Sequence, residues 1–164
     1  MISHAYCLGS FSHAELAPIA DRLAELGISI MTCAPAHVPV PPVAWLRSLG
    51  VNVCSGSDGI RDAWTPLGDG DMLERAMLLA FRFGWNKDDE LAAAFDIVTT
   101  GGARALGLAD YGLGAGCQAD FVLMQGETLG AAVVEHPHER TVVSRGRIVA
   151  QGGSFVGFDT RLPA

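Results

Sequence analysis

Two side chains that could carry out acid–base chemistry follow short apolar segments. His4 comes directly after Met1–Ser3, and Asp58 follows the apolar run Val51–Cys54 and a stretch of small residues. The carboxyl ends of parallel strands lie at the same edge of a sheet, so we expect these two side chains to face the same opening there. An imidazole and a carboxylate placed together could exchange protons or bind a divalent metal ion. The simpler alternatives are a core or surface histidine at position 4 and a turn or helix cap at position 58.

Four further residues lie in loops that would follow these strands. Trp64 could anchor its loop against the next helix. His37 follows the second expected strand in a Pro-rich segment. It could contact a substrate, but we interpret it mainly as an exposed loop histidine. Arg61 and Asp62 are interpreted as a local ion pair.

Two motifs have the residue pattern of known binding sites, but their position relative to the predicted strands does not fit such sites. His136-x-His138 lies between two expected strands late in the chain, and we interpret it as a polar loop. Gly112-x-Gly114-x-Gly116 precedes a strand, whereas a dinucleotide-binding motif follows one. No Cys-x-x-Cys pair of the zinc-knuckle type occurs among the four cysteines, Cys7, Cys33, Cys54 and Cys117.

The segments that would position His4 and Asp58 alternate between strand and helix. Ser12 and Glu15 form a capping box at the start of a helix that Gly27 ends. This alternation predicts parallel neighbours with right-handed crossovers. Early strands are predicted at Met1–Ser3, Ile28–Met31 and Val51–Cys54, and helices at Ser12–Leu26, Val43–Leu49, Asp71–Phe83, Asp88–Val98 and Thr100–Leu106.

The last third of the chain changes in character. From Gly112 onward it is richer in glycine and β-branched residues, with a tight turn expected at Ser144-Arg145-Gly146. The final segment, 152–164, has no clear period. Strands are predicted here at Asp120–Met124, Thr141–Ser144 and Arg147–Ala150.

Composition narrows the class of protein. The chain has 164 residues, a net charge of −7, a sequence pI near 5.0 and no cluster of Lys and Arg, which argues against nucleic acid as a partner. Its hydrophobic fraction is 49% and its mean hydropathy is +0.29, but no apolar run approaches the roughly 18 residues of a membrane span. We expect no membrane partner. No signal peptide is visible, so the cytoplasm is the expected location.

The loop that starts at Asp58 resembles a known family. Ser57-Asp58-Gly59, followed by Asp62, Trp64 and Pro66-Leu67-Gly68, is similar to the last barrel strand and loop of the amidohydrolase superfamily, in its cytosine deaminase-like branch. Further matches occur in the family's order over nearly the whole chain. They are Ile2-Ser3-His4-Ala5 (the sixth strand), Leu106–Leu123 (the return to a β-sandwich) and Val142–Val149 (the closing hairpin).

The resemblance implies an α/β fold. Residues 1–110 would supply the C-terminal strands and helices of a (β/α)8 TIM-type barrel, and residues 111–164 part of a small β-sandwich and a tail. It also implies catalytic roles for His4 and Asp58, a metal ligand in Asp58 and a substrate contact in Trp64. The implied cofactor is one divalent metal ion: zinc, iron(II) or manganese. Gly59 replaces a second acid common in that branch, which we interpret as space for a bulkier ring than cytosine.

The family's His-x-His pair on the first strand and its fifth-strand metal-ligand histidine have no match in this chain. We therefore expect the C-terminal part of a longer enzyme, inactive alone, and either oligomeric or dependent on an N-terminal half. The predicted activity is metal-dependent hydrolysis of a C–N bond in a small amino-substituted heterocycle, such as a pyrimidine or triazine. The alternatives are a non-catalytic α/β binding module and one half of a split enzyme.

Overall fold

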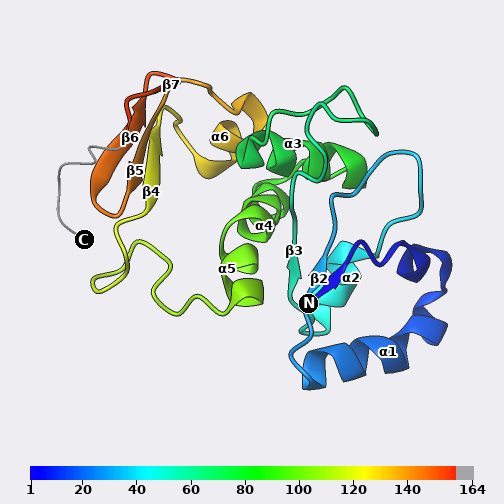
Figure 1. Cartoon of the computed structure of the whole chain (residues 1–164). Helices are drawn as coiled ribbons and strands as arrows, with labels where there is room; N and C mark the ends of the chain where they lie inside the picture. The colour runs from blue at the N-terminus through cyan, green and yellow to red at the C-terminus, as the bar shows by residue number, and fades with distance from the viewer. Residues whose placement is uncertain (158–164) are drawn as a thin grey trace.

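The computed structural model describes residues 1–157. They form a mixed α/β structure with two sheets, and helices lie between them (Figure 1). The elements in chain order are β1 (Ile2–Ser3), η1 (Tyr6–Ser10), α1 (His13–Glu25), β2 (Ile30–Met31), α2 (Val43–Ser48), β3 (Val53–Cys54), α3 (Met72–Phe83), α4 (Asp88–Val98), α5 (Thr100–Leu106), β4 (Phe121–Met124), α6 (Leu129–Glu135), β5 (Arg140–Ser144), β6 (Arg147–Gln151) and β7 (Ser154–Phe155).

The first sheet is parallel, as the alternating pattern predicts. Its order is β1-β2-β3, and Ile30 pairs with Ile2 on one side and with Val53 on the other. Ile30 and Val53 are fully buried, because helices cover this sheet. The main core around it consists largely of aliphatic side chains, among them Leu16, Leu46, Leu79 and Ile97.

The helices before and after β2 begin and end where the sequence indicates. In α1 the Ser12 side chain accepts a hydrogen bond from the Glu15 backbone, and Glu15 accepts one from the Ser12 backbone, which completes the predicted capping box. Gly27 follows α1 with a φ of +61°, a conformation that glycine adopts without strain. The predicted helices thus occur within one or two residues of their expected bounds.

The outer edge of the parallel sheet at β3 is not bare. An isolated sheet of three parallel strands has two open edges, but the chain around α4 and α5 partly covers this one. The Ser55 N–H donates to the Ile97 carbonyl oxygen at 3.1 Å, and the Asn52 side-chain amide donates to the Gly101 carbonyl oxygen at 3.0 Å. Gly101 permits this approach, since a Cβ there would lie 2.8 Å from the Val53 carbonyl oxygen.

The second sheet is antiparallel, in the order β4-β5-β6-β7. The sequence analysis did not predict helix α6 beside this sheet. It also did not predict strand β7, which lies in the final segment without a clear period. Thr128 caps α6 by accepting a hydrogen bond from Ala131, and Val133 is fully buried against α3 and α4. Residues 158–164 of the expected tail lie outside the described part of the chain.

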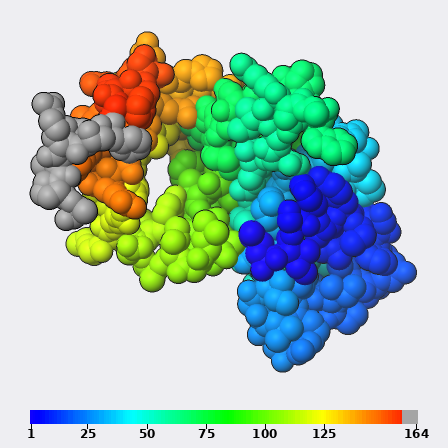
Figure 2. Space-filling view, viewed as in Figure 1, coloured from blue at the N-terminus to red at the C-terminus, as the bar shows by residue number. Residues whose placement is uncertain are grey.

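The two sheets belong to two lobes. Figure 2 shows the blue-to-green lobe meeting the yellow-to-red one near α3 and α6, with an opening lower down between them. We propose a domain boundary near residue 110, because the parallel sheet precedes this residue and the antiparallel sheet follows it. Within residues 1–157, no helix is long and apolar enough to cross a bilayer.

Candidate functional site: three strand ends at one cleft

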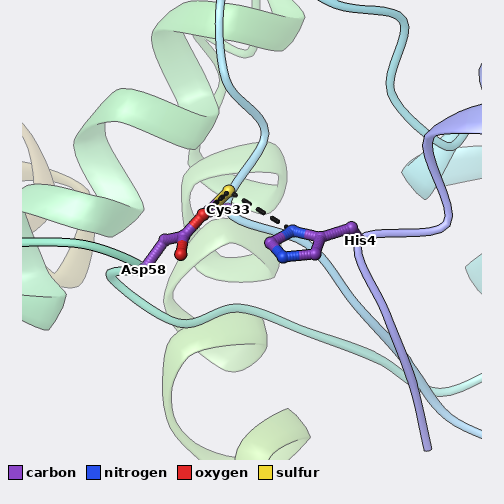
Figure 3. Close-up of side chains that lie close together, drawn as sticks. All are labelled: His4, Cys33 and Asp58. Atoms are coloured by element: carbon purple, nitrogen blue, oxygen red, sulfur yellow. Dashed lines mark hydrogen bonds between the residues drawn. The ribbon is translucent and has the colours of Figure 1, made fainter. Parts of the chain in front are cut away.

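Three side chains that can bind metal meet where the parallel strands end. His4 follows β1, Cys33 follows β2 and Asp58 follows β3. One ligand atom from each lies within 4.8 Å of the other two (Figure 3). The prediction that His4 and Asp58 lie at one end of parallel strands is therefore confirmed, and Cys33 lies between them.

Cys33 is the connecting member of this cluster. Its Sγ lies 3.3 Å from Asp58 Oδ2, to which the thiol donates, and 3.9 Å from His4 Nδ1. Cys33 is buried, His4 is half-buried and Asp58 is exposed, so the cluster runs from the core to the surface. Burial raises the pKa of the Cys33 thiol, and its hydrogen bond to Asp58 acts in the same direction, so the free thiol is protonated at neutral pH.

Tyr6 adds a second hydrogen-bonding partner for His4. Its hydroxyl lies 3.0 Å from His4 Nδ1 and 3.4 Å from Cys33 Sγ. Burial raises the pKa of Tyr6 well above its ordinary value, and the hydrogen bond with Cys33 adds to this rise. Tyr6 is therefore a phenol at neutral pH and can donate its proton to Nδ1, which leaves the imidazole proton on Nε2.

Arg75 of α3 fixes the backbone beneath two of the three side chains. Its Nη1 donates to the Cys33 carbonyl oxygen at 3.2 Å, and its Nη2 donates to the Ser57 carbonyl oxygen at 3.0 Å. Its Nε is buried and has no hydrogen-bond partner within residues 1–157. One guanidinium thus ties the loop after β2 to the loop after β3 and sets the spacing between Cys33 and Asp58.

The backbone is unusual at all three strand ends. His4, Ala34 and Asp58 have φ values of +64°, +47° and +61°, a region that residues other than glycine seldom adopt. Such conformations cost on the order of 1–3 kcal/mol each and persist where the surrounding structure imposes them. Their coincidence at three adjacent strand ends indicates that this edge of the sheet is shaped for a site.

The cluster opens into a cleft of about 1240 Å3. His37 and Trp64 both line it, which places these two sequence candidates beside His4 and Asp58. The Trp64 side chain is 94% exposed, so it does not anchor its loop against the next helix. Apolar side chains of the cleft wall include Leu67, Leu78 and Phe81.

Asp62 organises the loop that carries Trp64. Its carboxylate accepts hydrogen bonds from the backbone N–H groups of Trp64 at 2.9 Å and Thr65 at 3.1 Å. The expected Arg61–Asp62 ion pair is absent from the ion pairs of residues 1–157, because Asp62 turns toward the backbone instead. A Cβ at Gly59 would lie 2.1 Å from Asp62 Oδ2. The glycine therefore makes room for this carboxylate, whereas the sequence suggested open space for substrate.

The His136-x-His138 motif lies away from the cleft. His136 and His138 lie in the loop between α6 and β5 and are not part of the cleft wall, as expected for a polar loop. Sequence reasoning missed Cys33, Tyr6 and Arg75. Cys33 could have been found, since it follows its strand as closely as His4 and Asp58 follow theirs.

Known proteins are similar to this chain in sequence and in structure over most of its length. The sequence pattern of the Amidohydrolase family matches residues 1–150. The chain belongs to the amidohydrolase family. The crystal structure of N-isopropylammelide isopropylaminohydrolase from Burkholderia multivorans superposes on this amidohydrolase chain with a TM-score of 0.92 and 51% identity, covering 94% of this chain and 40% of that one.

Two further relatives of the amidohydrolase chain give the same coverage. N-isopropylammelide isopropyl amidohydrolase of Pseudomonas sp. (strain ADP) is 30% identical over 150 residues, which are 91% of this chain and 37% of the relative. The structure of 5-methylcytosine deaminase from Klebsiella pneumoniae with 5-fluorocytosine gives a TM-score of 0.79 and 29% identity, over 91% of this chain and 40% of that one. The chain thus spans about two fifths of the length of these proteins.

Proposed function

We propose that this chain supplies the C-terminal part of a metal-dependent amidohydrolase, including the last strands of its barrel. The enzyme would remove an amine from a small amino-substituted heterocycle, a triazine or a pyrimidine. The observation that carries the proposal is the convergence of His4, Cys33 and Asp58 at the carboxyl ends of parallel strands, inside a cleft. The relatives named above support the substrate class.

The donor atoms of the cluster fit a divalent metal ion. Imidazole, thiol and carboxylate are all ligands of first-row divalent metals, and here they already lie within 4.8 Å of one another. Asp58 is the residue of this chain that we propose to hold the ion in the complete enzyme, and His4 lies beside it at the same strand ends. When bound, such an ion lowers the pKa of water toward ~7 and so supplies a nucleophile at neutral pH.

The side chains of this chain would handle the protons. Asp58 is an exposed carboxylate at the cleft and can accept the proton of the attacking water. His4, with Nδ1 accepting from Tyr6, keeps its proton on Nε2 and can donate a hydrogen bond to the oxygen that adds to the ring carbon. Trp64 offers a flat apolar face for the ring. The bond between ring carbon and amine then breaks, and the amine leaves with the transferred proton.

Two substitutions in an enzyme extended to the full length of its relatives test the proposal. Asp58→Asn should lower turnover by about 10²–10⁴-fold, because it removes the proton acceptor. His37→Ala, at the same cleft, should cost roughly tenfold or less, the effect of one lost hydrogen bond. The assay is amine release from an N-alkylamino triazine and from cytosine, together with the bound metal content. Near-wild-type turnover with full metal content in Asp58→Asn would refute the role of Asp58.

A further inference from the structure

The proposed function gives the thiol of Cys33 no task, although Cys33 lies between His4 and Asp58 (Figure 3). Its Sγ is 3.3 Å from Asp58 Oδ2, to which the thiol donates, and 3.9 Å from His4 Nδ1. Cys54, the other buried cysteine, lies 3.9 Å from the Met1 sulfur and outside this cluster. Burial of a small side chain alone therefore does not explain why a thiol follows β2.

The Asp58 carboxylate needs a partner to keep one orientation. The terminal torsion of an aspartate side chain is broad, so a carboxylate that accepts no hydrogen bond turns easily. Asp58 is exposed, and the Cys33 thiol donates the one hydrogen bond that this carboxylate accepts within residues 1–157. That bond occupies Oδ2 and leaves Oδ1 free. The thiol therefore determines which oxygen of Asp58 is available to other groups in the cleft.

The donor of this hydrogen bond is held more firmly than the acceptor. Cys33 is 5% exposed, and its carbonyl oxygen accepts a hydrogen bond from Arg75 Nη1 at 3.2 Å. Its Sγ also lies 3.4 Å from the Tyr6 hydroxyl. A thiol is a weak donor, but a charged acceptor such as a carboxylate strengthens the bond. The buried thiol is thus in a position to orient the exposed carboxylate.

We propose that Cys33 is a positioning residue for Asp58: its S–H group holds Oδ2 and leaves Oδ1 to face the metal ion and the attacking water. The inference deepens the proposed function and rests on it for the roles of Asp58 as metal ligand and proton acceptor. Cys33 keeps its proton and acts on the ion only through Asp58. Hydrogen-bond partners of metal ligands typically contribute about 10–100-fold to metal affinity or activity.

The contact itself is tested in the 164-residue chain without metal. Exposed Cys7 and half-buried Cys117 are first replaced by serine, so that Cys33 and Cys54 are the remaining thiols. The infrared S–H stretching band moves to lower frequency when a thiol donates to a carboxylate. We expect such a lowered band, which disappears in Cys33→Ser and rises in frequency in Asp58→Asn, because a neutral amide oxygen is a weaker acceptor. A band that Asp58→Asn leaves unmoved would overturn the proposal.

The effect on the metal site is tested in the enzyme extended to the full length of its relatives. Cys33→Ala should weaken Zn2+ binding by about 10–100-fold and, with Zn2+ in excess, lower kcat by about tenfold while KM changes by less than about twofold. Cys33→Ser retains a donor and should recover most of both losses. Cys54→Ala removes the matched buried thiol and should leave Zn2+ affinity and kcat unchanged.

Two outcomes in the extended enzyme would overturn the role of Cys33: parental Zn2+ affinity and kcat in Cys33→Ala, or losses that Cys33→Ser does not recover. If Cys33→Ala does not fold, the infrared comparison of the parent with Asp58→Asn still decides whether the contact exists, since it leaves Cys33 in place. The proposed function is tested by turnover in Asp58→Asn, and the role of Cys33 by variants in which Asp58 is intact. The two failures are therefore distinguishable.

Discussion

The Arg140 guanidinium faces the Asp71 carboxylate with both of its terminal nitrogens, Nη1 at 2.8 Å from Oδ1 and Nη2 at 2.7 Å from Oδ2. Asp71 also caps α3, because Oδ1 accepts hydrogen bonds from the backbone of Leu73 and Glu74. Arg140 begins β5. One ion pair therefore joins the helix that carries Arg75 to the antiparallel sheet.

Removing the charge of Asp71 should destabilise the protein. The Asp71 and Arg140 side chains are only 10% and 17% exposed, so Asp71→Asn should lower the free energy of unfolding by about 2–4 kcal/mol, between the values for surface and buried pairs. The control is Glu25→Gln, which breaks the exposed Arg22–Glu25 pair and should cost less than about 1 kcal/mol. Urea unfolding measures both, and equal losses would show that the Asp71–Arg140 pair contributes no more than a surface pair.

Stability should fall in acid through Asp71 and Asp96. Burial raises the pKa of each carboxyl, but hydrogen bonds and nearby arginines outweigh it and bring both pKa values below the ordinary value. Asp96 contacts Thr100, Arg47 and Arg104. A depressed folded-state pKa adds stability above the unfolded value of about 3.9, and this stability is lost as the pH falls through the folded-state pKa.

The measurement is the urea midpoint between pH 7 and pH 2. The midpoint urea concentration should stay constant between pH 7 and about pH 5 and decrease at lower pH. Asp71→Asn and Asp96→Asn should each flatten that decline, because the substituted side chain no longer takes up a proton on unfolding. A decline as steep in both variants as in the wild type would assign the acid sensitivity to other carboxyls.

Arg75→Lys should loosen the strand-end loops while leaving the fold intact. A lysine offers one terminal nitrogen and cannot match the fork that reaches the Cys33 and Ser57 carbonyl oxygens, so we expect a loss of about 1–2 kcal/mol. Amide hydrogen exchange should become faster around residues 33–34 and 57–58. Arg82→Lys is the matched control on the same helix, because Arg82 donates an exposed hydrogen bond to the Val38 carbonyl oxygen. Unchanged exchange in Arg75→Lys would mean that the loops hold their shape without it.

Gly59→Ala tests whether Asp62 fills the space above the glycine. The new Cβ would lie 2.1 Å from Asp62 Oδ2, so the substitution should cost about 1–3 kcal/mol or displace the Trp64 loop. Asp62→Ala in the same chain should remove most of this cost, giving a favourable coupling energy in a double-mutant cycle. Gly56→Ala, whose Cβ would meet only Met31 Sδ at an ordinary 3.7 Å, should be tolerated. Additive losses for Gly59→Ala and Asp62→Ala would contradict the clash.

The sequence alone determined the local elements and two members of the site. The capping box at Ser12, the glycine after α1 and the strand–helix alternation depend on neighbours a few residues apart, so they can be read without the fold. The order of these elements also placed His4 and Asp58 at one edge, because parallel strands leave no other arrangement.

The surroundings of those two residues depend on contacts between distant parts of the chain. Cys33 lies 29 residues from His4 and 25 from Asp58 in the chain, and Arg75 reaches Cys33 across 42 residues, so no local pattern connects them. Helix α6 was missed for a similar reason: it has seven residues, too few to be stable alone, and burial of Val133 against α3 and α4 holds it. Capping and periodicity act within one or two turns of chain, whereas side-chain contacts across the cleft exist only after the strands have come together.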